Sequence, residues 1–561
     1  MDVGKLQRKL TKWSMQRIEE PQYGLFASKK DLRLFDLYHL LYDMEWLRIA
    51  HANVSRNSGS KTAGCDGINM TYFDKNLEEN LQKLAGELRK QIFKPQPVRR
   101  VYIPKRNGKL RPLGIPSVRD RIVQEVLRMI LEPIFEAEFY RHSYGFRPNR
   151  TTHDAIGIVI HHSSSNSKYF WVIEGDIKAY FDTINHKKLM QLVRCRIKDK
   201  KLLRLVWRFL KAGVMEDKLF KHTEKGTPQG GIISPLLANL YLHELDMYMQ
   251  QKAGTPRYRE KRRLRGMPCY VHIRYADDFV VMCSGTRAEA EVMKQELQQF
   301  LTDKLCLTLS MEKTRITHIN DGFKFLGFDI KREITGKGNL YPKHKIPNEA
   351  IRNFREKVME ITSPSSYNHS VISKITALNY LLRGWGNYYR TAHFVSRIYG
   401  NLDHFVFWRL AHWLGTKHRC QMPRVMRRYK VRVDGAVTLG TEAVALFRLS
   451  SIKFGILRKR TFTNPYDQAD IQLNREELYE NKFQWNGNEN LPGINDLRYL
   501  VFKHDNWTCQ KCGCKVNKKT GEVDHIRPLK RFKLSKDASD LSNLQTLCIS
   551  CHKQKTQSES N

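Results

Sequence analysis

The feature that most constrains this chain is a pair of strand-like runs that bring aspartates to the ends of strands. The first run, residues 169–176, is rich in aromatic and β-branched side chains and ends at Asp176. The second run, residues 271–281, has two β-rich arms on either side of Ala-Asp-Asp. This arrangement predicts a β-hairpin that carries Asp277 and Asp278 side by side at its tip.

Carboxylates crowded at one edge of a sheet repel one another unless cations lie between them. If the strand that ends at Asp176 is the neighbour of the hairpin, the three aspartates can hold two Mg²⁺ ions about 3.5–4 Å apart. Two such ions favour in-line phosphoryl displacement, because they stabilise charge on the attacking and leaving oxygens. The interpretation fails if Asp176 lies more than about 10 Å from the other two side chains. Without further motifs, an Asp-Asp pair is more often a solvated turn, and a lone aspartate is often a helix N-cap.

The overall charge restricts the partners of the chain. It has 97 Lys and Arg against 57 Asp and Glu, a formal net charge of +40 and a pI near 9.8. Such an excess favours a polyanionic partner, and nucleic acid is the usual one. An anionic membrane is the competing partner, but no apolar run reaches about 18 residues, so no membrane association is predicted. The N-terminal residues contain acids and lack the apolar core of a signal peptide, which favours a cytoplasmic protein.

Periodicity gives a coarse order of elements along the 561 residues. Residues 1–90 are predicted to be helical, and residues 97–121 to form a basic β-hairpin with Asn-Gly at its turn. A helix with one apolar face is predicted from about 120 to 137. Strands and helices alternate over residues 169–330, and helices follow over residues 345–430. With 41% hydrophobic residues, the chain can build cores for three or four domains of roughly 100–200 residues each.

Two segments are densely basic. From Lys417 to Val433 there are seven Lys or Arg and no acid, and a similar excess lies between Lys252 and Arg265. A charge run can be a solvated face, but this density favours contact with phosphate. Aromatic residues at helical spacing nearby favour a core over base-stacking platforms; they include Trp385, Tyr388, Tyr389, Phe405, Phe407, Trp408 and Trp413.

Five of the 11 cysteines crowd into the C-terminal segment. In a reducing compartment such a cluster indicates a metal site more often than disulfides. Two C-x-x-C pairs, separated by 35 residues, predict a tetrahedral structural Zn²⁺ site with the ligands Cys509, Cys512, Cys548 and Cys551. Cys514 lies out of register with these pairs and is predicted to be a bystander.

Seven ordered blocks of the chain resemble those of group II intron reverse transcriptases and maturases. Three central blocks are Asp176-Ile-Lys-Ala-Tyr-Phe-Asp, the Gly-Thr-Pro-Gln-Gly-Gly segment from Gly226 with its Ser-Pro and Ala-Asn, and Tyr275-Ala-Asp-Asp. The others are Ile103-Pro-Lys with Gly-Lys-Leu-Arg-Pro-Leu-Gly-Ile-Pro, Ser143-Tyr-Gly-Phe-Arg, Leu309-Ser-Met-Glu-Lys-Thr and Phe325-Leu-Gly-Phe. The resemblance extends from about residue 50 to the C-terminus and shows no departure at the catalytic positions.

The resemblance implies roles at a polymerase site. Asp176, Asp277 and Asp278 would hold two Mg²⁺ ions, and Phe181 would pack beneath the deoxyribose and exclude a 2′-hydroxyl. The other contacts with the incoming dNTP would come from Lys105 and Arg111 on the triphosphate, Lys313 as proton donor to the leaving pyrophosphate, and Gln229 on a base or ribose. From the residues alone, Phe181 is as readily a core aromatic, and the cations are as readily solvated surface charges.

The C-terminal segment resembles the HNH endonucleases, in which a β-hairpin and a helix hold one divalent metal against a phosphate. By this resemblance His525 would be the general base that activates water, and Asp524 and His552 would bind the metal, here Mg²⁺. Asn543 would brace the loop that holds His525. A plain zinc ribbon, with Asp524 and His525 as a surface pair, is the alternative.

These resemblances imply an α+β fold, a right-hand polymerase with fingers, palm and helical thumb, followed by a zinc-stabilised ββα HNH module. The implied domains are an N-terminal extension with the start of the fingers (1–90), reverse transcriptase fingers and palm (91–335), a helical thumb or maturase domain (336–430), a DNA-binding segment (431–494) and an HNH endonuclease with its four-cysteine zinc site (495–561).

The implied function is that of an RNA-directed DNA polymerase of a mobile group II intron, which also acts as a maturase in splicing. Its HNH module would nick target DNA site-specifically, and the freed 3′-hydroxyl would prime copying of the intron RNA. The implied partners are group II intron RNA, target DNA and dNTPs, with the protein as monomer or dimer on the RNA in a bacterial cytoplasm. The alternatives are a splicing-only maturase, against which the intact aspartates argue, and a reverse transcriptase repurposed for defence or diversification, against which the HNH tail argues.

Overall fold

The computed structural model describes residues 2–16, 34–104, 110–164, 167–216, 219–221, 226, 230–334, 338, 340–457, 464–467, 501–502, 505–516, 520–526 and 543–560. The chain divides into two compact units, Met1–Ile471 and Gln472–Asn561. Helices and strands occur in both units, in agreement with the predicted α+β class. Among the described helices, none has the combination of length and apolar character that a membrane crossing requires.

Helices dominate the described part of residues 1–90, as predicted. They are α1 (Val3–Gln16), η1 (Tyr38–Tyr42), α2 (Met44–Ser55), η2 (Ser58–Lys61), α3 (Met70–Phe73), η3 (Asp74–Asn76) and α4 (Leu77–Arg89). The next helix, α5 (Val118–Glu136), begins two residues before the predicted start because the Ser117 side chain caps it by accepting from the Asp120 N–H. The apolar residues predicted to share one face are all buried, but α5 is buried nearly all round, polar residues included, and packs against α1 and α2.

The predicted basic hairpin is present as β1 (Val98–Pro104) and β2 (Leu110–Ile115), which pair antiparallel. Its Asn-Gly turn lies outside the described residues. β1 also pairs in parallel with β4 (Val214–Glu216), and β4 pairs with β5 (Leu219–Lys221), which gives a sheet of order β2-β1-β4-β5.

The aspartates belong to a second sheet, of order β6-β7-β3-β8. Its strands are β3 (Trp171–Asp176), β6 (Tyr270–Tyr275), β7 (Asp278–Cys283) and β8 (Arg315–His318), each antiparallel to its neighbours. The helices of this region are α6 (Thr152–His162), α7 (Tyr180–Thr183), α8 (His186–Arg194), α9 (Lys200–Leu210), α10 (Ser234–Ala253), α11 (Pro256–Leu264) and α12 (Arg287–Leu305). The alternation of strands and helices predicted for residues 169–330 is therefore confirmed.

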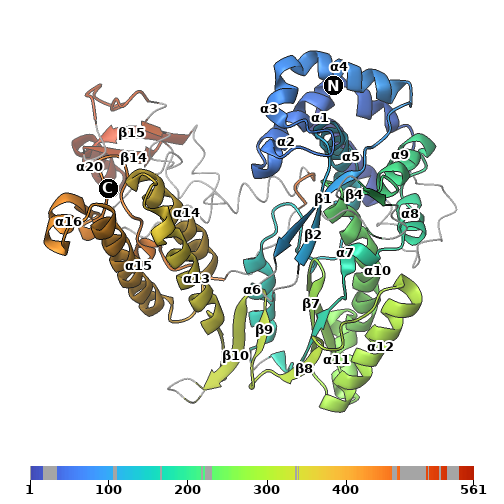
Figure 1. Cartoon of the computed structure of the whole chain (residues 1–561). Coiled ribbons are helices and arrows are strands. Elements are labelled where there is room, and N and C mark those ends of the chain that lie inside the picture. The colour runs from blue at the N-terminus through green and yellow to red at the C-terminus, as the bar shows by residue number, and fades with distance from the viewer. Residues whose placement is uncertain are drawn as a thin grey trace. The chain divides into compact units, whose positions relative to one another are not determined.

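The two faces of this sheet pack against different cores. On one face, Ile173 of β3 belongs to the core that includes residues of α10 and α12, two helices that Figure 1 shows beside the sheet. On the other face, Val172 of β3 belongs to a core shared with the helices of residues 348–429. Because side chains alternate along a strand, Asp176 and its partner Asp278 on β7 lie on this second face.

Helices also fill residues 345–430, as predicted. A small sheet of β9 (Phe323–Phe325), β10 (Phe328–Ile334) and β11 (Leu340–Lys345) precedes them. The elements that follow are α13 (Asn348–Ile361), η5 (Pro364–Ser366), α14 (Val371–Tyr389), α15 (Val395–Lys417), α16 (Met422–Tyr429), β12 (Lys430–Val433), β13 (Ala436–Leu439) and η6 (Leu449–Ser451). The interpretation of the aromatic residues as core is confirmed for Trp413, which is 2% exposed, but not for Trp408, which is 39% exposed.

The second unit contains β14 (Gly521–His525), β15 (Leu544–Cys548) and α20 (Ile549–Ser560). The two strands pair antiparallel, and the helix follows β15 directly. This is the ββα order that the sequence predicts for the C-terminal module.

Candidate active sites and metal centre

The turn between β6 and β7 carries the adjacent aspartates. Tyr275 and Asp278 are the last cross-strand partners of the hairpin, so Ala276 and Asp277 form its tip. In the neighbouring ladder Asp278 is paired with Asp176. Directly opposite residues in an antiparallel pair have Cα atoms about 4.5–5.5 Å apart and side chains on one face. The structure thus brings the three predicted aspartates together, and the charge of Asp176 acts on both Asp277 and Asp278.

Crowding raises the pKa of the carboxyl groups in the turn. Desolvation raises the pKa of Asp278 to about 6, and the charges of Asp277 and Asp176 add to this increase. Desolvation also raises the pKa of Asp277, again with a contribution from Asp176. The raised pKa values mean that burial and the neighbouring carboxylates make the anionic forms costly, a cost that a bound cation would reduce. Three crowded carboxylates of this kind fit hard divalent cations, which prefer oxygen ligands.

Two of the basic side chains predicted to contact the dNTP, Lys313 and Arg111, lie near the aspartates. Lys313 Nζ donates to Asp176 Oδ2 at 2.8 Å, and this hydrogen bond raises the pKa of Lys313. Arg111 of β2 is close enough to oppose the rise in the pKa of Asp277. Two further predicted contacts, Lys105 and Gln229, lie outside the described residues.

The ends of the loop that contains Gln229 are described, at Gly226 and Gly230. A Cβ on Gly226 would lie 3.0 Å from the Phe181 carbonyl oxygen, and one on Gly230 would lie 2.3 Å from the Gly114 oxygen. Both glycines also have positive φ, 92° and 113°, which a side chain would strain. The loop therefore begins against Phe181 and ends against β2, the strand that carries Arg111.

Phe181 lies partly buried in α7, close to the aspartates in sequence and space. Its ring packs against the core and is edge-on to the ring of Phe146, with 6.4 Å between centroids. Phe146 is 54% exposed and has a φ of 56°, an uncommon conformation for a bulky residue. Sequence reasoning treated Phe146 only as part of a block and missed its place beside Phe181.

A pocket of about 310 Å³ opens on the face that carries Asp176 and Asp278. Lys313 lines it from the segment after α12, and Leu326 and Gly327 line it from the turn between β9 and β10. The Phe-Leu-Gly-Phe block thus reaches the same pocket as the aspartates, although about 50 residues separate it from the hairpin in sequence.

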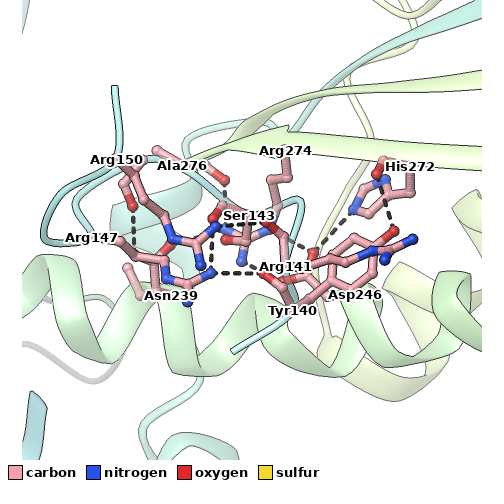
Figure 2. A network of polar contacts seen from close by, with 12 residues as sticks. Tyr140, Arg141, Ser143, Arg147, Arg150, Asn239, Asp246, His272, Arg274 and Ala276 are labelled. Atoms are coloured by element: carbon pink, nitrogen blue, oxygen red, sulfur yellow. Dashed lines mark hydrogen bonds and ion pairs between the residues drawn. The ribbon is translucent and has the colours of Figure 1, made fainter. Parts of the chain in front are cut away.

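A buried polar network lies behind the hairpin (Figure 2). Arg274 of β6 donates to the Asp246 carboxylate of α10 from Nε at 2.8 Å and from Nη2 at 2.5 Å. Its Nη1 donates to the Ala276 carbonyl at 2.9 Å and to Asn239 Oδ1 at 3.0 Å. His272 contacts the same Asp246 carboxylate at 3.0 Å. The guanidinium thus joins the turn that carries Asp277 to α10.

The network is fully enclosed. Arg274, Asp246 and His272 are all 0% exposed. Burial alone would raise the pKa of Asp246, but the Arg274 guanidinium holds that pKa well below its usual range. Sequence reasoning missed these residues, yet a charged residue inside an otherwise apolar strand was an available indication, since buried charges are almost always paired.

The C-terminal unit brings Asp524 of β14 and His552 of α20 together. His552 Nε2 lies 3.7 Å from Asp524 Oδ1, and His552 Nδ1 lies 2.8 Å from Glu522 Oε2. Lys555 and Gln545 contact Asp524 Oδ2 at 2.5 and 3.0 Å. Sequence reasoning missed Glu522, although alternation along a strand places it on the same face as Asp524.

The other two predicted nuclease residues lie on the same hairpin. His525 ends β14 and pairs with Leu544, but its side chain lies outside the described part of the structure. Asn543 is buried directly before β15, and its backbone carbonyl accepts from the Ile526 N–H at 2.7 Å. Asn543 is therefore fixed beside the segment that follows His525.

The four predicted zinc ligands form one cluster. The Sγ atoms of the four cysteines all lie within 4.8 Å of one another; the cysteines are Cys509, Cys512, Cys548 and Cys551. Sulfurs about 2.3 Å from a tetrahedral zinc are about 3.8 Å apart, and Cys512 Sγ and Cys548 Sγ are 3.8 Å apart. Cys514 lies outside the group of four, although its Sγ is 3.4 Å from that of Cys512. The cluster fits a zinc site with four cysteine ligands.

Three family models match consecutive parts of this chain. Residues 103–330 match the reverse transcriptase (RNA-dependent DNA polymerase), residues 351–430 the group II intron maturase-specific domain, and residues 509–558 the HNH endonuclease. Together with the aspartate hairpin and the cysteine cluster, these matches define a reverse transcriptase that carries maturase and endonuclease domains.

Curated proteins are similar over most of the chain. The group II intron-encoded protein LtrA of Lactococcus lactis subsp. cremoris is 30% identical over 603 residues, covering 92% of this chain and 95% of LtrA. Protein YkfC of Escherichia coli (strain K12) is 40% identical over 373 residues, covering 63% of this chain and 95% of YkfC. The putative COX1/OXI3 intron 2 protein of Saccharomyces cerevisiae is 26% identical, covering 91% of this chain and 65% of that protein.

The chain belongs to the family of group II intron-encoded proteins. It is a reverse transcriptase and maturase with an HNH endonuclease domain, so the predicted family and class of enzyme are confirmed. Its maturase and reverse transcriptase domains imply binding to intron RNA, and its HNH domain implies binding to DNA.

Proposed function

We propose that Asp176, Asp277 and Asp278 are the metal ligands of the polymerase site. The observation that carries this proposal is the register that pairs Asp176 with Asp278 beside the hairpin tip. Two bound Mg²⁺ ions would supply activation of the primer 3′-hydroxyl and stabilisation of charge on the phosphates. The raised pKa of Asp277 and Asp278 supports the assignment, because a carboxylate that lacks positive partners gains most from a cation.

The incoming dNTP would be held between the basic hairpin and Phe181. Arg111 would bind the triphosphate, in company with Lys105. Phe181 would exclude a 2′-hydroxyl, and Gln229 would contact the base or ribose from a loop whose ends lie against Phe181 and β2. Lys313 would protonate the leaving pyrophosphate, which its position 2.8 Å from Asp176 supports.

In the C-terminal unit, Asp524 and His552 would hold one Mg²⁺, and Glu522 is a further oxygen donor on the same face. His525 would act as general base at the end of β14, with Asn543 fixing the adjoining segment. Zn²⁺ in the Cys509, Cys512, Cys548 and Cys551 cluster would hold the two halves of this small module together.

The other parts of the chain would bind the RNA and DNA on which the two active sites act. The thumb or maturase domain, residues 336–430, would grip intron RNA by shape and backbone, and residues 431–494 would contact target DNA. Exposed cations of α16 support a phosphate-binding role for residues 336–430, and those of α11 give the reverse transcriptase region a second basic surface. The nick made by the HNH module would supply the primer for copying of the intron RNA, with the protein as monomer or dimer on that RNA.

Primer extension tests the polymerase assignment. Asp277→Ala should lower the rate of copying of an RNA template, with Mg²⁺ and dNTPs, by at least about two orders of magnitude, because one ligand of the transition-state metals is lost. Asp303→Ala on the exposed surface of α12 is a matched control that should copy normally. Equal activity of the wild type and Asp277→Ala would refute the assignment.

A nicking assay on target DNA tests the second site. His525→Ala should stop nicking of the second strand while extension of a supplied primer continues. Asp277→Ala should show the reverse pattern and so serves as the reciprocal control. Loss of both activities in one folded variant would contradict the separation of the two sites.

A further inference from the structure

The hairpin tip that carries Asp277 adopts an unfavourable backbone conformation. Ala276 has a φ of 57°, in the left-handed region that residues with a Cβ rarely adopt. The cross-strand pairing of β6 and β7 ends at Tyr275 and Asp278, so the strand ladder does not include Ala276. Something besides the ladder must therefore hold the carbonyl and the direction of this turn.

The Arg274 guanidinium provides such a hold. It binds the Ala276 carbonyl at 2.9 Å, and the same planar group is fixed by the Asp246 carboxylate and by Asn239 (Figure 2). Arginine suits this task because its donors form a rigid fork. The turn is thus tied to α10 through one side chain that donates to four acceptor atoms on three residues.

His272 allows a role of this network in stabilising the fold to be separated from a role in positioning the Ala276–Asp277 turn. Like Arg274, it lies on β6, is 0% exposed and contacts Asp246, at 3.0 Å. Its other ring nitrogen, Nδ1, has no hydrogen-bond partner within the described residues. His272 therefore shares the buried Asp246 carboxylate with Arg274, but its ring makes no hydrogen bond to the turn within the described residues.

We propose that Arg274 is a positioning residue for reverse transcription, which sets the Ala276–Asp277 turn so that the Asp277 carboxylate is presented to the metals. This inference rests on the proposed role of Asp277 as a metal ligand. Within the described part of the chain, Arg274 hydrogen-bonds to Asp246, Asn239 and the Ala276 carbonyl and to no proposed metal ligand, so it would act through that carbonyl. Groups that orient metal ligands typically contribute about 10–100-fold to metal affinity or activity.

The test compares Arg274→Lys with His272→Gln in the full-length protein. A lysine can pair with Asp246, but its single ammonium cannot reproduce the fork that also holds Ala276. For each variant, the Mg²⁺ concentration for half-maximal primer extension, kcat, the KM for dNTP and the thermal midpoint are measured. Asp277→Asn is assayed alongside, because it reports on the metal site itself.

Arg274→Lys is expected to raise the half-maximal Mg²⁺ concentration, or to lower kcat, about tenfold or more, with the KM for dNTP little changed. His272→Gln should show a comparable fall in thermal midpoint with the Mg²⁺ requirement unchanged. If the two variants behave alike, the network is only structural and the inference is wrong. If Asp277→Asn keeps full activity, the proposed metal site is wrong instead.

If Arg274→Lys does not fold, Asn239→Ala takes its place. This change leaves the Arg274–Asp246 pair intact but removes the acceptor that orients the Nη1 end of the fork. It also frees the Gly145 carbonyl, to which Asn239 Nδ2 donates at 2.7 Å. A several-fold rise in the Mg²⁺ requirement supports the positioning role, and an unchanged requirement overturns it.

Discussion

Substitution of Gly145 by alanine tests how tightly the position of the catalytic turn controls copying. The new Cβ would lie 2.4 Å from the Ala276 backbone nitrogen, whereas ordinary contact begins near 3.4 Å. The Gly145 side cannot yield freely, because Asn239 binds its carbonyl at 2.7 Å and the neighbouring Arg147 is held by Glu136. The turn must therefore retreat by about 1 Å, and a misplacement of that size can cost about 10²-fold in rate.

We therefore expect Gly145→Ala to copy an RNA template about 100-fold more slowly, while overpacking lowers its stability by about 1–3 kcal/mol. Single-turnover primer extension, at a temperature where thermal unfolding shows the variant to be folded, measures this effect. Gly86→Ala in α4 is the matched control, because a Cβ there meets nothing within 4 Å. It should keep full activity and gain up to about 1 kcal/mol. Near-normal copying by folded Gly145→Ala would refute the reasoning.

Three further changes have defined outcomes. Because the pKa of Asp278 is raised to about 6, protons compete with metal below that pH, and the Mg²⁺ requirement of primer extension should rise up to about tenfold per unit as pH falls; a requirement independent of pH would contradict this. Glu136→Ala leaves the buried Arg147 charge unpaired and should lower the free energy of unfolding by about 3–5 kcal/mol in urea titrations, whereas a loss under about 1 kcal/mol would speak against it. Cys548→Ser should reduce bound zinc, measured by metal analysis, and abolish nicking without stopping primer extension.

Much of the fold follows from local patterns. The aspartate hairpin, the basic hairpin and the helices of residues 345–430 were predictable because alternation and helical periodicity are properties of short segments. The all-round burial of α5 was not predictable in this way, because helices from distant parts of the chain cover its polar side. Asp120 is 1% exposed there, although it is a charged residue and the sequence predicted only where the apolar residues lie.

In the candidate sites too, local sequence patterns were predictable, whereas contacts between distant segments were not. The three aspartates and the four cysteines were predicted because their chemistry requires a particular residue type at a particular spacing. Arg274 and Asp246 were not, since their pairing joins a strand to a helix 28 positions away and only tertiary structure brings them together. Phe146 was likewise missed, because its position depends on backbone approach between Gly145 and the turn.

The two candidate active sites are supported by different physical means. The polymerase aspartates extend from a sheet with a large hydrophobic core on each face, so burial alone can fix the strands that carry them. Among the described residues of the C-terminal unit, the buried core cluster holds only Cys509, Val516, Leu547 and Cys551, two of which are proposed zinc ligands. Val501, Phe502 and Leu544 of this unit are buried as well. Because two of the cysteines in this cluster are proposed zinc ligands, bound Zn²⁺ would contribute folding free energy to the module directly. We therefore expect the geometry of the proposed nuclease site to depend on zinc more than that of the aspartate hairpin does.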